Sequence, residues 1–496
     1  MNRSNEGTVD RSKPSGSDFL QLNAEDAPPG GLSDWLAGHL RRAVADGRLP
    51  VGSRLPATRV LAAELHVSRG VVTEAYQRLI EDGHAAGRGR NGTVVVAAPA
   101  PPPPHSPGRP QPAPAADLFT APGTDVFDAL RDRPARIDLS PGVPDLAAFP
   151  RAAWLRAERA VLDGLAAAGL GYGDPRGTPE LRRAVANWLA RYRGIRADPG
   201  EVLIVAGTSQ AFGLIAEVLT SAGLTEIAVE DPGSLGARQH LRHRGLATPP
   251  VPVDADGLRV DALRATGAPA VLLTPAHQFP TGVVLGGGRR RELMRWARTG
   301  GLIVEDDYDA EHRYDRPPVP ALRSMLAEHV CYAGSVSKLL APALRVGWIL
   351  APPRHREALV AAKRFADLGN AVLPQLVLAR LMESGELERH LRLLRRRHRR
   401  RRDAMTAALA ARLPGAVVHG AAAGLHLLVT LPGEVADTDL AAAALARGVK
   451  TQPLSWHCQR PNRPGLVLGY AASRVPDITE GVAVLAEVLR ELRHSR

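Results

Sequence analysis

The segment GSVSKLLAPALRVGW, residues 334–348, carries Lys338, one of only four lysines in a chain of 496 residues. The other lysines are Lys13, Lys363 and Lys450. Lysine forms a Schiff base with an aldehyde and arginine cannot, so a lysine kept in an arginine-rich chain indicates a need for an amine. Ser335 lies three residues before Lys338 and Arg345 seven after it, and both residue types suit phosphate oxygens. The segment predicts a site for a phosphorylated aldehyde.

Carboxylates follow an apolar strand in LIVEDDYDAEHRY, residues 302–314. The ends of strands are where α/β folds bind their ligands. A phosphorylated pyridine aldehyde needs a carboxylate that keeps its ring nitrogen protonated and a hydroxyl group near its ring oxygen. We predict that Asp306 pairs with the ring nitrogen and that Tyr308 bonds to the ring oxygen. Taken alone, the acidic pair could instead be a metal site.

A third segment, VLIVAGTSQAFGL (residues 202–214), is typical of a strand, a turn of small residues and a helix. The backbone N–H groups of Thr208, Ser209 and Gln210 at that helix start can hold a phosphate group. A fourth segment, TPAHQFPTGVVL (residues 274–285), is another strand-to-loop stretch that we expect near the same face. Each segment alone is weak evidence, because a Gly-Thr-Ser turn or a Ser-x-x-Lys helix start is common.

The region from about residue 137 to the end alternates short β-rich runs with Ala- and Leu-rich helical stretches. The β-rich runs are Glu201–Val205, Glu226–Val229, Ala270–Leu273 and Leu302–Val304. Such alternation is typical of an α/β domain with a mostly parallel sheet. With the four segments in order, it predicts a pyridoxal-phosphate domain of fold type I and aminotransferase architecture, with a smaller C-terminal subdomain.

The N-terminal part predicts a winged helix-turn-helix unit of α+β class. Leu32, Leu36, Leu40 and Val44 are spaced four apart and share one helical face. In GRLPVGSRLPATRVLAAEL (residues 47–65), a turn is followed by a helix that Thr58 can cap. Ser68 can cap a third helix that Gly83 ends, with Val72, Ala75, Tyr76 and Leu79 on its inner face. Its exposed N-terminal end suits the major groove of DNA.

A glycine-rich hairpin, GRGRNGTVVV, follows, and Arg88 and Arg90 at its tip can reach phosphate groups or the minor groove. A small helical domain that docks a protein partner is the alternative. The whole run nevertheless resembles the GntR-type winged helix. That resemblance implies binding to double-stranded DNA. The implied contact residues are Arg54, Thr58, Arg59, Ser68, Arg69, Thr73 and the wing residues Arg88–Gly92.

From about residue 32 to the end, the chain resembles the MocR family of GntR-type regulators. The matching segments are EDPGS, TPAHQFPTG, EDDYDAEHRY and GSVSKxLxPxLRxGW. The resemblance implies pyridoxal phosphate as cofactor, with Lys338 as the Schiff-base lysine and Asp306 and Tyr308 as ring contacts. It implies Ser335 and Arg345 as phosphate contacts, and a head-to-tail homodimer in which each head lies beside the partner's large domain.

Two positions depart from the family pattern. Ser234 stands where members often carry an aromatic residue after EDPG, so stacking on the cofactor ring is in doubt there. Phe279 stands where aminotransferases have an Asn, and the strand GLVLGYA (residues 465–471) lacks the Arg that grips a substrate carboxylate. The nearby candidates for that role are Arg447, Arg460 and Arg463.

The expected domain order follows from composition. We predict a flexible tail (1–30), the DNA-binding domain (31–97), a Pro-rich linker (98–136) and the cofactor domain (137–496). The formal net charge of +12 fits a polyanion partner or a mere drift in composition. Two cysteines, the lack of a long apolar run and the polar N-terminus favour a cytoplasmic protein with no membrane partner.

Two further features have weaker signals. The stretch RLLRRRHRRRRDAM (residues 392–405) predicts either a solvated helical face or an additional surface for the DNA backbone. His457 and Cys458 have no partners at ligand spacing, so we interpret them as structural and predict no metal site.

We therefore expect a regulator, not an enzyme, whose cofactor domain senses an amine or amino-acid effector. Three alternatives are an active aminotransferase with a DNA-binding head, a sensor of pyridoxal phosphate itself, and a large domain that has lost the cofactor and serves only for dimerisation. Lys338 argues against the last.

Overall fold

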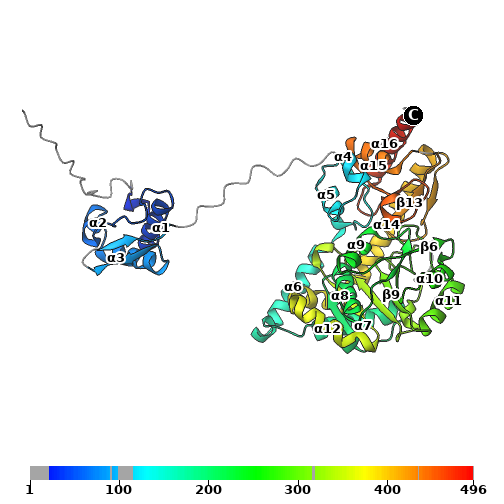
Figure 1. The fold of residues 1–496 in the computed structure, drawn as a ribbon, viewed down its shortest axis with the longest axis horizontal. Coiled ribbons are helices and arrows are strands. Elements are labelled where there is room, and N and C mark those ends of the chain that lie inside the picture. Colours follow the sequence, from blue (N-terminus) through cyan, green and yellow to red (C-terminus); the bar gives the residue numbers. More distant parts are fainter. Residues whose placement is uncertain (1–21, 90–91, 99–114, 315–318, 434, 495–496) are drawn as a thin grey trace, which may run out of the picture. The chain divides into compact units, whose positions relative to one another are not determined.

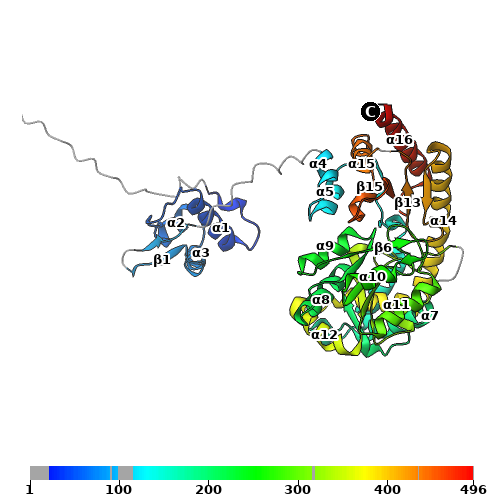
Figure 2. The ribbon, with the colours of Figure 1, turned by 45° about the vertical axis from the view of Figure 1, so that its right-hand side comes forward.

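The computed structural model describes residues 22–89, 92–98, 115–314, 319–433 and 435–494, and the chain divides into units 1–112 and 113–496. Figures 1 and 2 show the helices of the first unit and the layered second unit. The first unit consists of α1 (Leu32–Ala45), α2 (Thr58–Glu64), α3 (Arg69–Glu81), β1 (Ala85–Gly87) and β2 (Thr93–Val95). The two strands pair antiparallel, with Ala85 opposite Val95.

The first unit has its own apolar core. Leu36, Leu40 and Val44 of α1 are buried against α3, as their spacing predicts. Ser68 caps α3 by accepting a hydrogen bond from the Val71 N–H (3.4 Å). The predicted cap at Thr58 is wrong, because Ala57 is the N-cap of α2 and Thr58 is already helical. The expected tail ends earlier than residue 30, since Leu22 packs against this core.

The second unit is built on an eight-stranded sheet among its described residues. The strand order is β4 (Val202–Val205), β11 (Gly347–Leu350), β10 (Val330–Ser335), β9 (Leu302–Asp307), β8 (Ala270–Leu273), β5 (Ala228–Asp231), β6 (Pro250–Asp254) and β7 (Gly257–Leu258). The strands from β10 to β6 pair parallel, and β11 pairs antiparallel with both β4 and β10. The central strands are buried along their length, because helices cover both faces of the sheet.

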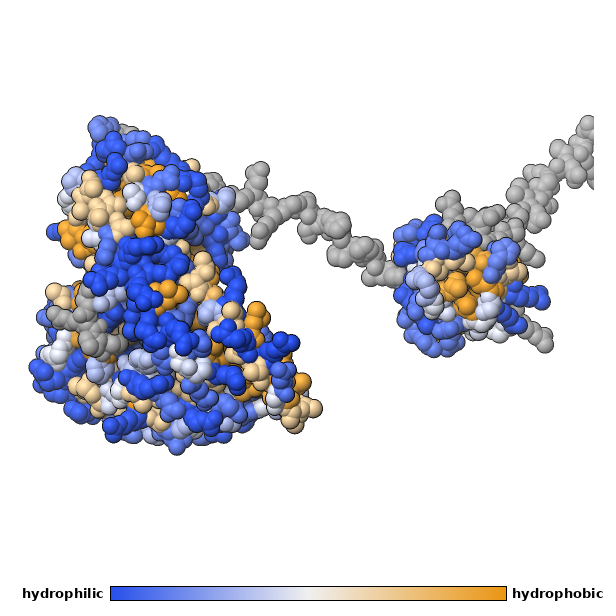
Figure 3. Space-filling view, turned by 180° about the vertical axis from the view of Figure 1, so that it is seen from behind, coloured by the Kyte–Doolittle hydropathy of each residue, from blue (hydrophilic) through white to orange (hydrophobic). Residues whose placement is uncertain are grey.

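Alternate residues of each strand point to opposite faces of the sheet and pack in separate hydrophobic cores. Leu203 and Val205 pack with one helix layer, and Val202 and Ile204 with the other. The first layer contains α8 (Thr208–Ser221), α9 (Leu235–His243) and α12 (Pro353–Asp367). The second face is covered by α7 (Pro179–Arg193), α13 (Val372–Glu383), α10 (Val260–Thr266) and α11 (Gly287–Arg298), and α6 (Arg151–Gly164) packs on α13. Hydrophilic residues predominate on the face of this unit in Figure 3.

A smaller subdomain carries a four-stranded antiparallel sheet. Its strands, in order, are β12 (Val417–His419), β13 (His426–Thr430), β16 (Gly465–Gly469) and β15 (Gln452–Pro453). Its helices are α14 (Glu386–Arg412), α15 (Asp437–Ala446) and α16 (Val475–His494). A short parallel pair joins β3 (Ile137–Asp138) to β14 (Val449–Lys450). The expected α/β class with a smaller C-terminal subdomain is thus confirmed.

The Pro-rich linker was expected to run to residue 136, and that boundary is wrong. The structure has α4 (Ala115–Thr120) and α5 (Val126–Asp132) in this segment. Phe119, Val126 and Leu130 are buried in the core of the smaller subdomain, where Phe119 stacks on Trp456. Because these apolar side chains are buried in that core, the segment belongs to the second unit, although the residues just before it are rich in proline.

Candidate functional site

Four strands of the large sheet end at one edge, and each ends in or leads into a segment singled out from the sequence. Asp306 lies near the end of β9, Lys338 follows β10, Thr274 follows β8 and Thr208 follows β4. The parallel strands β8, β9 and β10 share a direction, and two antiparallel steps through β11 give β4 the same direction. Their carboxyl ends therefore meet at one edge, where α/β folds bind ligands.

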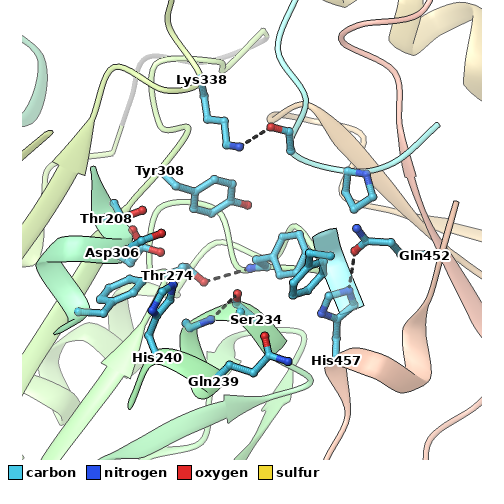
Figure 4. A pocket seen from close by; sticks show the side chains of 18 of the residues that line it. Thr208, Ser234, Gln239, His240, Thr274, Asp306, Tyr308, Lys338, Gln452 and His457 are labelled. Atoms are coloured by element: carbon cyan, nitrogen blue, oxygen red, sulfur yellow. Dashed lines mark hydrogen bonds between the residues drawn. The ribbon is translucent and has the colours of Figure 1, made fainter. Parts of the chain in front are cut away.

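A cavity of 680 Å³ opens at this edge. The large sheet and its helices supply one side, with Thr208, Ser209, Thr274, Asp306, Tyr308 and Lys338 among the lining residues. The smaller subdomain supplies Leu425, His426, Gln452 and His457. Figure 4 shows Thr208 and Asp306 on one side of this space and Gln452 and His457 on the other. Five of the predicted cofactor residues, Thr208, Ser209, Asp306, Tyr308 and Lys338, thus face the smaller subdomain across one space, whereas Gln210, Ser335 and Arg345 do not line it.

The start of α8 has the backbone geometry of an anion cradle. Its first intrahelical bond runs from the Ala211 N–H to the Gly207 carbonyl (3.1 Å), so the N–H groups of residues 208–210 precede the hydrogen-bond ladder. Gly207 has a positive φ of 82°, and a Cβ there would lie 3.3 Å from Arg345 Nη1. The helix dipole and the nearby guanidinium both favour a negative charge at this position.

Ser335 lies at the same cradle. A Cβ at Gly347 would lie 3.0 Å from Gly207 Cα and 3.2 Å from Ser335 Cβ. The Gln210 side chain turns away, because its Oε1 accepts from the Ala206 N–H (2.7 Å) and from Lys363 Nζ (2.9 Å). Only the backbone N–H of Gln210 is therefore available to a ligand. This N–H is the group that was predicted to hold phosphate.

Asp306 has an unusual environment. Its Oδ1 atom is buried and has no hydrogen-bond partner among the described residues. Burial, with a smaller contribution from the neighbouring Asp307 and Asp309, raises the pKa of this carboxyl to about 8. A buried acceptor of this kind calls for a cationic N–H donor. A protonated pyridine nitrogen has that chemistry.

Lys338 lies above this carboxylate and is partly buried. Its Nζ donates a hydrogen bond to the Gly142 carbonyl, as Figure 4 shows. Burial lowers the pKa of the Lys338 amine, while Asp309 and Asp306 oppose the shift. A lowered pKa increases the fraction of neutral amine, which is the form that attacks an aldehyde.

His277 and Asp309 were not assigned roles from the sequence, although both lie in segments quoted there. His277 Nδ1 lies 2.9 Å from Asp309 Oδ2 and 3.0 Å from the Tyr308 hydroxyl oxygen. These contacts hold Tyr308 in position beside Asp306. Burial raises the pKa of the Tyr308 hydroxyl, with Asp309 and Asp306 adding to the shift. The clue in the sequence was a histidine four residues after the end of β8.

The head presents the predicted DNA-contact residues at its surface. Arg54, Arg59, Ser68, Arg69, Thr73 and Arg88 are exposed, and Thr58 is half-buried. Arg69 Nε donates to Thr58 Oγ1 (3.2 Å), and this contact joins the start of α3 to the start of α2. Gly92 lies against the Arg54 side chain, which brings the wing close to the turn before α2. Arg90 lies outside the described residues.

Comparisons with known proteins match both halves of the chain. The model of aminotransferase class I and II covers residues 135–463, and that of the bacterial regulatory proteins of the gntR family covers residues 32–95. The probable rhizopine catabolism regulatory protein MocR of Rhizobium meliloti is 31% identical over 92% of this chain and 93% of its own length. The chain is a member of the MocR family of GntR-type transcription regulators.

Two further similarities support this assignment. The HTH-type pyridoxine biosynthesis transcriptional regulator PdxR of Corynebacterium glutamicum is 30% identical over 90% of this chain and 93% of its own length. The crystal structure of the α-aminoadipate aminotransferase LysN of Thermus thermophilus, complexed with N-(5′-phosphopyridoxyl)-L-leucine, matches with a TM-score of 0.68 and 28% identity. The match covers 77% of this chain and 98% of that one. The MocR-family chain is thus a DNA-binding regulator with an aminotransferase-like domain.

The three arginines considered for a carboxylate are not brought into the cavity of this MocR-type domain. Arg447 pairs with Glu491 (2.5 Å) and Glu487 (3.7 Å) at the surface. Arg460 donates to the Pro250 carbonyl (3.4 Å), and neither it nor Arg463 lines the cavity. None of the three arginines therefore lines this cavity, because closeness to β16 in the sequence does not bring their side chains to its cavity face.

The two departures from the MocR pattern have structural roles. Ser234 lines the cavity and caps α9 by accepting a hydrogen bond from the Ala237 N–H (3.2 Å). Phe279 packs edge-on against Tyr308, with ring centroids 6.2 Å apart, and against His457, at 4.9 Å. His457, interpreted as structural, also lines the cavity, and its Nε2 lies 3.2 Å from Gln452 Oε1.

The arginine-rich stretch forms the middle of α14 in this MocR-family chain. Arg397 Nε and Arg401 Nη1 lie 2.6 and 2.7 Å from Asp145 Oδ2, and the Asp145 side chain is buried. Arg395 donates to the Glu311 carbonyl (2.9 Å). The exposed arginines of the stretch are Arg392, Arg396, Arg399 and Arg400. The helix therefore combines structural arginines with a solvated face, and contact of that face with DNA stays a prediction.

Among the described residues, no helix combines the length and the apolar character that are needed to cross a membrane.

Proposed function

We propose that this regulator binds pyridoxal 5′-phosphate through a Schiff base at Lys338 and that ligand chemistry at this site controls its binding to DNA. When bound, the cofactor supplies an aldehyde carbon that condenses reversibly with amines. The residues of this chain would do the rest. Residues 208–210, Ser335 and Arg345 would hold the phosphate, and Asp306 would accept the pyridinium N–H.

The observation that carries the proposal is the unpartnered Oδ1 of Asp306. It is buried at the bottom of a cavity that also contains Lys338 and adjoins an anion cradle. Burial of an acceptor without a partner costs free energy, roughly 1–3 kcal/mol or more for a charged group. A pyridinium ring would relieve that cost, whereas a purely structural dimerisation domain has no need of such a carboxylate.

The control of DNA binding would be a coupling between two sites. An effector that binds the cofactor domain more tightly in one state of the protein shifts the population toward that state, with a coupling free energy of about 1–3 kcal/mol. We propose an amine or amino acid as effector. The name of the related pyridoxine biosynthesis regulator supports the alternative that pyridoxal phosphate itself is the signal.

We further propose a head-to-tail homodimer, in which each head lies beside the partner's large domain. Light scattering should then give a mass close to twice the 52.8 kDa of the chain. A monomer at working concentrations in the presence of cofactor contradicts this arrangement.

The experiment that tests the proposed cofactor site compares visible absorbance spectra of the parent, Lys338→Ala, Lys338→Arg and Lys450→Arg. The Schiff base gives a visible band, which the parent and Lys450→Arg should show and both Lys338 variants should lack. Lys450→Arg is the matched control, because it replaces another buried lysine and keeps its charge. No band in the parent after addition of pyridoxal phosphate overturns the proposal.

An active aminotransferase is the second candidate, and the same cofactor residues favour it. We propose regulation instead because the three arginines near β16 that could hold a substrate carboxylate lie outside the cavity. Sustained turnover of an amino donor and a keto acceptor, measured with the purified parent protein, decides for the aminotransferase.

A further inference from the structure

The wall of the cavity opposite the cofactor residues has a distinct composition. It is formed by His426 of β13, Gln452 of β15 and His457, with Phe279 packed between the two histidine rings. Figure 4 shows Gln452 and His457 facing the side that holds Asp306 and Thr208. An effector attached near Lys338 would extend from the cofactor toward this wall.

The two histidines of the wall are neutral at physiological pH. Burial, with smaller contributions from the Arg238 guanidinium and His426, lowers the pKa of His457 to about 3. Burial and the adjacent His277 lower the pKa of His426 to about 3. Neither ring therefore supplies a positive charge for an anion.

The hydrogen bonds of the wall leave a neutral donor. His457 Nδ1 accepts from the Leu235 N–H (3.4 Å), so the ring proton is assigned to Nε2, which donates to Gln452 Oε1 (3.2 Å). The Gln452 NH₂ group is then offered to the cavity. Such a donor suits a hydroxyl or carbonyl oxygen of a ligand.

Permanent positive charges lie elsewhere. Arg238 is buried behind the wall, where its guanidinium donates to the Trp456 carbonyl (2.8 Å) and the His457 carbonyl (3.1 Å). Arg131 on α5 lines the cavity, but its side chain is 71% exposed and pairs with Asp128 (2.6 Å). Among the lining residues that the structure describes, only Arg131 is a permanent cation, because Lys338 is the amine of the proposed Schiff base. His240 and His243 also line the cavity and belong to α9, whose first residue, Leu235, contacts His457.

A carboxylate in such a site would be poorly compensated. Removing an ion from water is costly unless a charged partner and hydrogen bonds replace its hydration. The aromatic edge of Phe279 and the neutral Gln452 donor favour an apolar or neutral polar body instead.

We propose that the effector is a primary amine whose amine-bearing carbon carries no carboxylate. This inference rests on the proposed cofactor site, because the amine must exchange with Lys338. It narrows the effector class from amines and amino acids to amines with an aromatic or neutral polar body.

The test uses matched pairs that differ only in the carboxylate: phenethylamine against phenylalanine, and tyramine against tyrosine. Each compound is titrated into the cofactor-loaded parent protein, and the shift of the visible band gives its Kd. We expect each amine to bind at least about tenfold more tightly than its amino acid. An amino acid that binds as tightly as its amine, or no response to either amine, overturns the inference.

Two variants at the wall sharpen this test. Gln452→Arg adds a cation to the wall and should lower the preference for amines about tenfold or more, whereas Gln452→Met removes the donor without adding charge and should keep the preference. An unchanged preference in a folded Gln452→Arg protein contradicts the inference. If Gln452→Arg does not fold, the titrations of the parent protein with the amine and amino-acid pairs still test the inference. Loss of the visible band itself counts against the cofactor site, while a band that responds best to amino acids counts only against the effector class.

Discussion

His277 Nδ1 lies 2.9 Å from Asp309 Oδ2, and both side chains are only 1% exposed. The same nitrogen is 3.0 Å from the Tyr308 hydroxyl oxygen. A single buried imidazole therefore connects a carboxylate to the tyrosine expected beside the cofactor ring.

Replacement of His277 by Ala should destabilise the protein. It leaves the buried Asp309 without this partner, and the expected loss in the free energy of unfolding is about 2–3 kcal/mol. Urea unfolding measures it. His494→Ala, at an exposed position near the end of α16, is the control and should change stability by less than about 0.5 kcal/mol. Equal stability of the two variants would show that the buried contact contributes nothing.

The raised pKa of Asp306 predicts a pH dependence of stability. The folded protein binds this proton up to about pH 8, while the unfolded chain releases it near pH 3.8. Between these values the folded state holds more protons, so the free energy of unfolding falls as pH rises from about 4 to 8. Each pKa unit corresponds to about 1.4 kcal/mol, and the total is expected to be a few kcal/mol.

Asp306→Asn removes this titration and should flatten the decline in the cofactor-free protein. Urea unfolding at several pH values between 4 and 8 measures the slope. The exposed Asp163→Asn is the control and should keep the parent slope. A parent slope that Asp306→Asn leaves unchanged assigns the pH dependence to other buried carboxyls, such as Glu230.

Arg88 at the wing predicts a measurable salt effect. If its guanidinium neutralises a DNA phosphate, Arg88→Ala should reduce the slope of log K against log salt by about 0.9. Fluorescence anisotropy with operator DNA at several KCl concentrations gives the slope. Arg298→Ala, an exposed substitution on α11, is the matched control. The same slope in both variants would rule out an Arg88 phosphate contact.

The arginine-rich helix predicts unequal effects of its arginines on stability. Asp145→Ala leaves Arg401 buried without its carboxylate and should cost about 3–5 kcal/mol. Arg399→Ala, on the exposed face, should cost less than about 0.5 kcal/mol. Thermal unfolding of both variants distinguishes them, and similar melting temperatures would mean that the whole stretch is merely solvated.

The residues at the ends of strands could be predicted from the sequence. Lys338, Asp306 and Thr208 each follow or end an apolar strand, and parallel topology brings such positions together. The buried helix face in the head could also be predicted, because Leu36, Leu40 and Val44 follow the helical period.

The opposite wall could not be predicted in the same way. Gln452 and His457 belong to the smaller subdomain and meet the large sheet only through tertiary packing. Arg131 lies on a seven-residue helix that follows a Pro-rich stretch, so composition assigned it to a linker. The arginine candidates failed because sequence distance from β16 says little about which face of the subdomain a side chain reaches.

Helix α14 belongs to two cores at once. Leu387 and Leu391 are buried with the large sheet, while Met405 and Leu409 are buried in the smaller subdomain. At 1.5 Å per residue its 27 residues span about 40 Å. The cavity is lined from both of these bodies. A ligand that drew the two walls of the cavity together would therefore have to tilt or bend α14, and a small change beside Lys338 would then displace the far end of the helix.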